Sequence, residues 1–152
     1  MTLKLMRREM IVGAAAVVAI GGLGSRSAAA TTAHYADALS AFLDGREALG
    51  SGIVLEAPEV AENGNMVGVS IEVESAMTAD DHVRQAVLLS TKNPVAEVAR
   101  FHFTPLSGRA FAATRIRLAE SQDVVALAEM ADGSLRRASR LVRVTVGGCG
   151  AV

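Results

Sequence analysis

The 152-residue sequence has no tryptophan, one tyrosine, four phenylalanines and a single cysteine. With so few aromatic rings, a core must be built from Val, Ile, Leu and Ala, and hydrophobic residues, at 51% of the chain, are numerous enough to build one. The same shortage leaves few rings to stack on nucleic-acid bases, and a formal net charge of −1 offers no basic stripe to phosphates. We therefore expect a folded domain that does not bind nucleic acid.

The sequence also lacks the residue patterns on which most enzymes depend. It has no Cys-x-x-Cys, no Gly-rich loop leading into a helix and no Ser-His-Asp arrangement. The histidines, His34, His82 and His102, do not stand at metal-ligand spacing to one another or to the cysteine. The paired acids Glu72 and Glu74 fall on the outward side of an alternating segment, which favours a solvated face. We expect no catalytic residues, no metal and no bound cofactor.

Residues 1–30 have the layout of an export signal. A basic start with Arg7 and Arg8 precedes an apolar run over 10–23, and three alanines at 28–30 fit a small-residue cleavage site. The paired arginines before a Gly/Ala-rich run indicate the twin-arginine route. A transmembrane anchor is the alternative, but the run is shorter than the roughly 20 apolar residues that a span needs. We expect cleavage and a mature protein outside the cytoplasm, with no membrane attachment.

The rest of the chain has one helical pattern followed by strand patterns. Apolar residues at helical spacing predict an amphipathic helix over about 33–44, capped by Thr31 or Thr32 and ended by Gly45. Strict alternation after the turn signal Asn63-Gly64-Asn65 predicts a half-buried strand. Further strands are predicted near 53–55, 82–91, 101–104, 111–118, 123–130 and 141–146. This makes about seven short strands, and no βαβ rhythm connects them.

Two of these segments, 82–91 and 123–130, are apolar enough to be either a strand or a buried helix. The pair Asp132-Gly133 favours a hairpin after the second. We therefore expect an all-β fold over residues 31–146, an immunoglobulin-like antiparallel β-sandwich with an N-terminal helix. Residues 147–152 would follow it as a flexible arm.

The arm holds the one cysteine, Cys149, between Gly147-Gly148 and Gly150. Glycine accepts most backbone conformations, so we expect these three glycines to act as hinges on both sides of a slim, exposed thiol. A thiolate is a nucleophile and a reversible acceptor of sulfur, and a carrier needs only one such atom on a mobile segment. Four arginines over 136–143 form a candidate basic patch, which we interpret as the exposed side of the last hairpin; the alternative is that it draws an anion toward the thiol.

An odd cysteine in an exported chain is also typical of intermolecular pairing. The alternative function is therefore an exported β-sandwich interaction module whose lone Cys149 forms an interchain disulfide. An independent thiol oxidoreductase is disfavoured, because no second cysteine is present to resolve a mixed disulfide. A buried thiol is disfavoured as well, since a glycine-flanked chain end holds a side chain poorly in a core.

The C-terminal segment resembles the SoxY family, the sulfur-carrier subunits of the periplasmic Sox thiosulfate-oxidation system. The similar segments are APEVAENGN (57–65), KNPVAEVARFHFTP (92–105), SGRA (107–110), TRIRLAESQDVVALAEMADGSL (114–135) and VTVGGCG (144–150). The resemblance implies an immunoglobulin-like fold and a covalent sulfur adduct on Cys149. It also implies that the chain is a carrier rather than an enzyme.

The resemblance further implies partners for the chain. These are a SoxZ-like subunit in a SoxYZ heterodimer, a haem c-type cytochrome that attaches thiosulfate, a manganese-dependent hydrolase that releases sulfate, and a sulfane dehydrogenase. One departure stands out, because family tails usually finish GGCGG, whereas Gly150 is followed here by Ala151 and Val152. The longer, bulkier end predicts a narrower set of partner enzymes.

Overall fold

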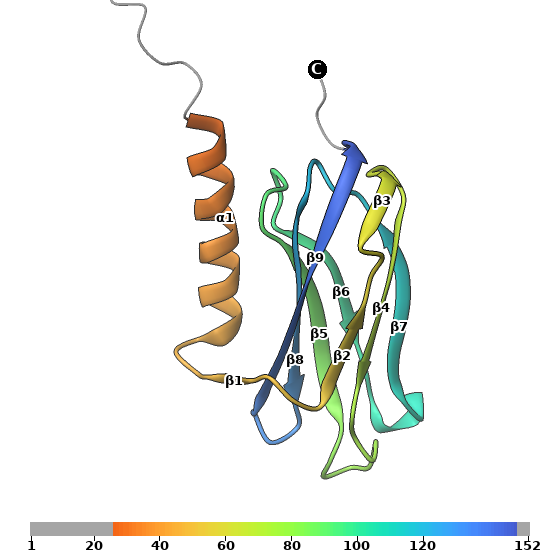
Figure 1. Ribbon diagram of the computed structural model, residues 1–152. Coiled ribbons are helices and arrows are strands. Elements are labelled where there is room, and N and C mark those ends of the chain that lie inside the picture. Colours follow the sequence, from red (N-terminus) through yellow and green to blue (C-terminus); the bar gives the residue numbers. More distant parts are fainter. Residues whose placement is uncertain (1–25, 149–152) are drawn as a thin grey trace, which may run out of the picture.

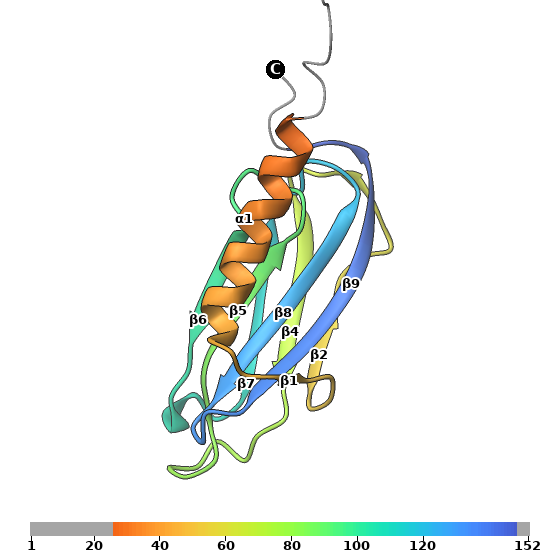
Figure 2. The same ribbon diagram turned by 90° about the vertical axis from the view of Figure 1, so that its left-hand side faces the viewer.

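The computed structural model describes residues 26–148, and the side chains of residues 33–148 (Figure 1). Two β-sheets pack face to face, and helix α1 lies along the outer face of the larger sheet (Figures 1 and 2). The elements are α1 (Arg26–Leu43), β1 (Ala48–Leu49), β2 (Ile53–Glu56), β3 (Val60–Asn63), β4 (Val67–Val73), β5 (Val83–Ser90), β6 (Glu97–His102), the 3₁₀ turn η1 (Pro105–Ser107), β7 (Ala110–Ile116), β8 (Gln122–Met130) and β9 (Leu135–Val146). The predicted all-β sandwich with a leading helix is confirmed.

The larger sheet has the order β1-β9-β8-β5-β6, and the smaller has the order β2-β4-β7. Neighbouring strands run antiparallel except at β9, where the short strands β1 and β3 both pair in parallel. These two short strands were not predicted, because segments of two and four residues are too short for an alternating pattern to be recognised. The strand β3 pairs with the last residues of β9.

The core confirms the predicted alternation in β4. Val67, Val69, Ile71 and Val73 are buried against the larger sheet, while the alternate residues Gly68 and Glu72 are exposed. Strands β5 and β8 are buried on both faces, one against the smaller sheet and the other against α1. Burial on both faces explains why their sequences are continuous apolar runs that could not be told from buried helix.

The helix α1 begins earlier than predicted. It starts at Arg26, so Thr31 and Thr32 lie inside it, and their predicted role as helix caps is wrong. The alanines at 28–30 are strong helix formers, so helical structure continues through the region predicted as a cleavage site. The boundary between an export signal and the domain therefore stays a prediction. Among residues 26–148, no helix is long and apolar enough to cross a membrane.

The two predicted chain reversals are confirmed. Gly45 follows α1 with a positive φ of 74°, which ends the helix. Asp132 and Gly133 connect β8 to β9, with Gly133 at φ 83° and the Asp132 carboxylate accepting the Ser134 amide at 2.8 Å. This hairpin fixes the register of β9, and β9 then carries the chain along the whole length of the sandwich (Figure 1).

Candidate functional site

The predicted attachment residue, Cys149, and the hinge glycine Gly150 lie outside the described residues, as do Ala151 and Val152. The structure does describe the segment that leads to them. We call Val146, Gly147 and Gly148 the arm root, because Val146 ends β9 and the predicted arm follows. The arm root lies beside the turn after β3 and the loop between β7 and β8.

Both glycines of the arm root are half-buried and lie against other backbone segments. A Cβ atom on Gly147 would collide with the carbonyl oxygen of Ala119, and one on Gly148 would collide with the backbone of Gly64. Neither glycine has a positive φ, so the requirement here is for close approach rather than for unusual dihedral angles. Their predicted role as hinges stays a prediction, and the structure adds this steric reason for glycine.

Hydrogen bonds hold the arm root to its neighbours. The Gly148 amide donates to the Leu118 carbonyl at 2.8 Å, and the Gly64 amide donates to the Val146 carbonyl at 2.7 Å. The Leu118 amide in turn donates to the Gly64 carbonyl at 2.8 Å, which closes a circuit of three backbone segments. The anchored chain therefore reaches to the residue immediately before Cys149.

The last residues of β9 are also held on both edges. On one edge β3 pairs in parallel, with Ala61 opposite Val144 and Asn63 opposite Val146. On the other edge there is no strand, because β8 starts only at Gln122. There the hydroxyl of Ser121 accepts a hydrogen bond from the Val144 amide at 2.9 Å. The arm root is thus the end of a fully supported strand.

Two buried polar side chains lie beneath the loop at 117–120, and the sequence reasoning missed them. Asn93 is 4% exposed and Gln122 is 1% exposed, in a molecule whose core is otherwise almost entirely apolar. Their amides are bonded to each other, with Gln122 Nε2 donating to Asn93 Oδ1 at 2.8 Å. A sequence signal was available, because Gln122 stands at the start of an apolar run and Asn93 lies just beyond the strand predicted near 82–91.

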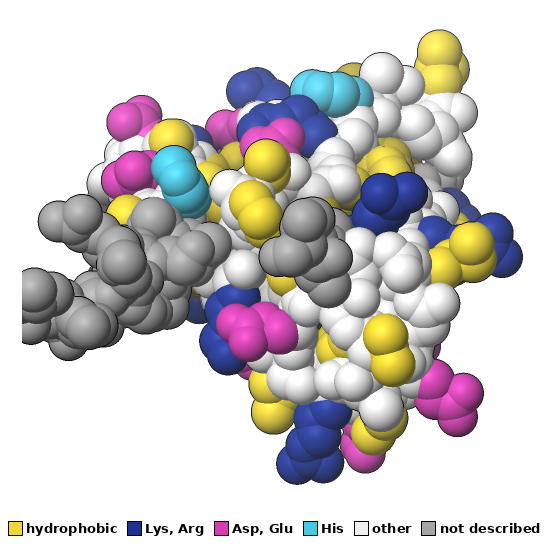
Figure 3. All heavy atoms as spheres, turned by 90° about the horizontal axis from the view of Figure 1, so that it is seen from above, with side chains coloured by type: hydrophobic (Ala, Val, Ile, Leu, Met, Phe, Trp, Pro, Cys, Tyr) yellow, Lys and Arg dark blue, Asp and Glu magenta, His cyan; other side chains and the backbone are white. Residues whose placement is uncertain are grey.

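Charged side chains near the arm root are of both signs, and Figure 3 shows this mixture on the end of the sandwich from which β9 leaves. Lys92 and Glu120, which lie in the loops there, form an ion pair at 3.5 Å. The predicted basic patch is not found as one patch, because its arginines are spread along β9 and alternate between its faces. Arg137 donates a hydrogen bond from Nη2 to the hydroxyl of Tyr35 in α1 at 3.4 Å. Of the four arginines, only Arg143 lies close to the arm root.

None of the predicted solvated residues is hydrogen-bonded to the arm root. His34 and His102 are exposed, and Nδ1 of His82 is 3.1 Å from the Thr78 carbonyl oxygen. Glu72 pairs with Arg109 at 2.6 Å on the outer face of the smaller sheet. Within residues 26–148, no three side chains of His, Cys, Asp or Glu gather as metal ligands.

Two of the shifted pKa values belong to carboxyls near the junction of α1 with the larger sheet. Gln85 donates to Glu129 at 2.8 Å and Arg46 does so at 2.9 Å, and both hold the pKa of that carboxyl below its ordinary value. Beside them, hydrogen bonds from Arg100 lower the pKa of Glu97. These groups join the end of α1 to β5, β6 and β8 and contribute nothing to the arm root.

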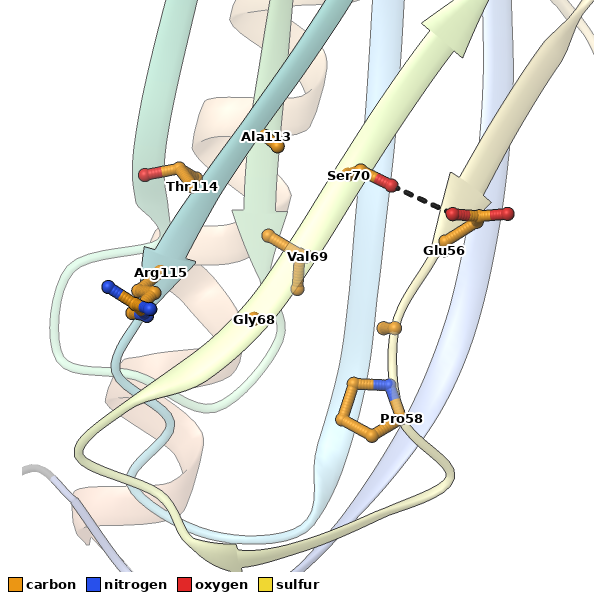
Figure 4. Close-up of a pocket in the computed structure, with 9 residues that line it drawn as sticks. Glu56, Pro58, Gly68, Val69, Ser70, Ala113, Thr114 and Arg115 are labelled. Atoms are coloured by element: carbon orange, nitrogen blue, oxygen red, sulfur yellow. Dashed lines mark hydrogen bonds between the residues drawn. The ribbon is translucent and has the colours of Figure 1, made fainter.

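The outer face of the smaller sheet carries an open groove (Figure 4). It runs over Gly68 and Ser70 of β4, between Glu56 on one side and Arg115 on the other. Ser70 donates to Glu56 at 3.0 Å, and no histidine or cysteine lines the groove. The groove therefore holds no activated nucleophile.

The comparisons agree with this architecture. A family model described as the sulfur oxidation protein SoxY matches residues 39–149. The solved structure of the sulfur carrier protein SoxY from Chlorobium limicola f. thiosulfatophilum is similar at 28% identity and a TM-score of 0.62, over 78% of this chain and 98% of that one. A superoxide reductase (neelaredoxin) from Ignicoccus hospitalis shares the fold, at 19% identity and a TM-score of 0.55, over 62% of this chain and 80% of its own. No match is found among curated protein sequences.

The family match covers both the support of the arm root and the predicted attachment residue. It includes the loops that hold the arm root, and it ends at Cys149 itself. The superoxide reductase adds only the fold, because its sequence identity to this chain is low. The family match spans well over half of the sequence, and the chain belongs to the SoxY family of sulfur oxidation proteins.

Proposed function

We propose that this chain is a carrier that holds sulfur intermediates covalently on Cys149 and presents them to the enzymes of sulfur oxidation. The observation that carries the proposal is the position at which the chain leaves the sandwich. The strand β9 brings the backbone to the rim of the sandwich, and the anchored arm root holds it there up to the residue before Cys149. A SoxY described as a sulfur carrier has a similar fold over 98% of its own length.

The chemistry requires little of the carrier. The thiolate of Cys149 would bond to the outer sulfur of thiosulfate, giving a cysteine S-thiosulfonate and releasing two electrons to a partner with a haem. Hydrolysis of the sulfur–sulfonate bond by a second partner would then release sulfate and leave a persulfide on Cys149. The carrier contributes a nucleophile, an accessible position and a rigid support, while the partners supply redox and hydrolytic groups.

The proposal includes a setting and partners. The chain is exported to the periplasm by the twin-arginine route and forms a heterodimer with a SoxZ-like subunit. A haem c-type cytochrome, a manganese-dependent hydrolase and a sulfane dehydrogenase act on the arm, and the chain itself catalyses no step.

Intact-protein mass spectrometry tests the function. The full chain, with its SoxZ-like partner, is incubated with thiosulfate and the attaching cytochrome, and the mass of the chain is recorded. We expect a thiosulfate-sized adduct that is absent from Cys149→Ser and is removed by a thiol reductant. A chain that gains no sulfur would refute the carrier function, and a covalent dimer as the only cysteine product would support the disulfide-linked interaction module instead.

A further inference from the structure

The loop between β7 and β8 is the support of the arm root, and the structure shows what holds that loop. Residues 117–120 bond to the arm root only through Leu118, whose amide goes to Gly64 and whose carbonyl accepts from Gly148. The Leu118 side chain is fully buried in the core. One residue therefore ties the arm root to the core, to the turn after β3 and to its own loop.

The amides of Asn93 and Gln122 bond to the residues on both sides of Leu118. Asn93 Nδ2 donates to the Arg117 carbonyl at 2.7 Å, and its Oδ1 accepts from the Ala119 amide at 2.9 Å. Gln122 Nε2 donates to the Glu120 carbonyl at 3.1 Å. Because a backbone donor and a backbone acceptor both face Asn93, only one orientation of its amide satisfies them.

The remaining bonds of the network connect it to a second loop. Gln122 Oε1 accepts from the Lys92 amide at 2.7 Å, so the loop after β5 is joined to the loop after β7. The side-chain oxygen and nitrogen of both amides have hydrogen-bond partners, and both side chains are almost completely shielded from water. A satisfied polar network of this kind specifies one arrangement of the segments that it joins.

We propose that Asn93 and Gln122 are positioning residues for the carrier arm. By fixing Arg117, Ala119 and Glu120, they fix the Leu118 carbonyl that anchors Gly148, and so set the point and direction at which the chain leaves the sandwich toward Cys149. Neither side chain is hydrogen-bonded to Val146, Gly147 or Gly148, the described residues of the arm root. Their effect on sulfur transfer rests on the proposed carrier function, whereas their effect on the arm root does not.

Amide hydrogen exchange of the full chain, read by NMR at Gly148, tests the positioning directly and needs no sulfur compound. We expect Asn93→Ala to lower the protection of the Gly148 amide about tenfold, as expected for a weakened hydrogen bond, while the amides of Val125 and Leu127 keep theirs. The milder variant Asn93→Ser introduces no charge and keeps a hydroxyl that can pair with only one of the two backbone groups, so a smaller loss is expected. It decides the question if Asn93→Ala does not fold.

The control is Val125→Ala, which removes buried atoms from the cluster beneath α1 and touches no part of the arm root. If Gly148 loses protection equally in this control, the network acts through global stability and the positioning role is refuted. Wild-type protection of Gly148 in both Asn93 variants would refute it as well.

A second measurement separates positioning from the carrier function. The rate at which the attaching cytochrome loads Cys149 should fall severalfold in Asn93→Ala and stay at the wild-type value in Val125→Ala. If wild-type chain is never loaded, the carrier function fails while the exchange result at Gly148 stands. If Gly148 loses protection but loading is unchanged, the arm root is positioned by the network without consequence for transfer, and the functional part of the proposal is refuted.

Discussion

The two ends of β9 are held by different kinds of interaction. At its start, Leu135 is buried in the apolar cluster beneath α1, together with Val87, Leu89, Val125 and Leu127. At its end, the chain is held by backbone hydrogen bonds, by glycines that allow close approach and by buried amides. Apolar contacts are non-directional and allow small shifts of the groups that they join. Hydrogen bonds and close backbone contacts fix the position of the chain within a few tenths of an ångström. The directional end is the one that carries the candidate arm.

The largest expected effect comes from the apolar end. Leu127 is fully buried between β8 and α1, so Leu127→Ala should lower the free energy of unfolding by about 2–5 kcal/mol. Urea denaturation measures this loss. We expect the Gly148 amide to keep its local protection from hydrogen exchange under native conditions, because the arm root shares no contact with that cluster. Loss of that protection would show that the two ends are one cooperative unit.

The next effect comes from the directional end. In Gly148→Ala the new Cβ would run into the backbone of Gly64, so the arm root must move away or the chain must strain. We expect a loss of about 1–3 kcal/mol in the free energy of unfolding and increased exchange of the Gly64 amide.

The matched control for this variant is Gly68→Ala in β4. Its added Cβ meets no atom within 4 Å, and the residue has no positive φ, so its stability should change little or rise slightly. If both alanine variants behave alike, close approach at the arm root does not require glycine at position 148, and the conformational freedom of the predicted hinge becomes the better explanation.

The comparison also shows what the sequence could predict. The alternation over 67–73 and the Asp132-Gly133 turn are local signals, and both are confirmed. The Gly-Gly-Cys-Gly ending singled out the candidate attachment residue, which lies outside the described residues. These features depend on residues that are neighbours in the chain, so a pattern within ten or fifteen residues contains them.

The support of the arm root could not be predicted in the same way. Asn93, Leu118 and Gly148 are distant in sequence and are brought together only by the tertiary fold. The glycines of the arm root were interpreted from their flexibility, since nothing in the sequence shows that Ala119 and Gly64 approach them closely. The early start of α1 was missed for another reason, because the alanines that extend the helix also fit a cleavage site.

The smallest effect concerns the ion pair of Glu129 near the start of β9. In the folded state, hydrogen bonds from Gln85 and then Arg46 hold the pKa of Glu129 below its ordinary value of 4.5, and the side chain is 17% exposed. A carboxyl with a lowered pKa stabilises the folded state at pH values above its unfolded pKa, and this contribution is lost as the pH falls through the folded value. Glu129→Gln should therefore cost about 1 kcal/mol at pH 7 and progressively less below pH 4.5, where the wild-type carboxyl also becomes neutral. Urea denaturation at pH 7 and pH 3 measures the difference.

A constant gap between the two proteins across that range would assign the stabilisation to the shape of the Glu129 side chain rather than to its charge. Exchange at Gly148 should not respond to this titration, because Glu129 lies at the hairpin end of β8, away from the arm root.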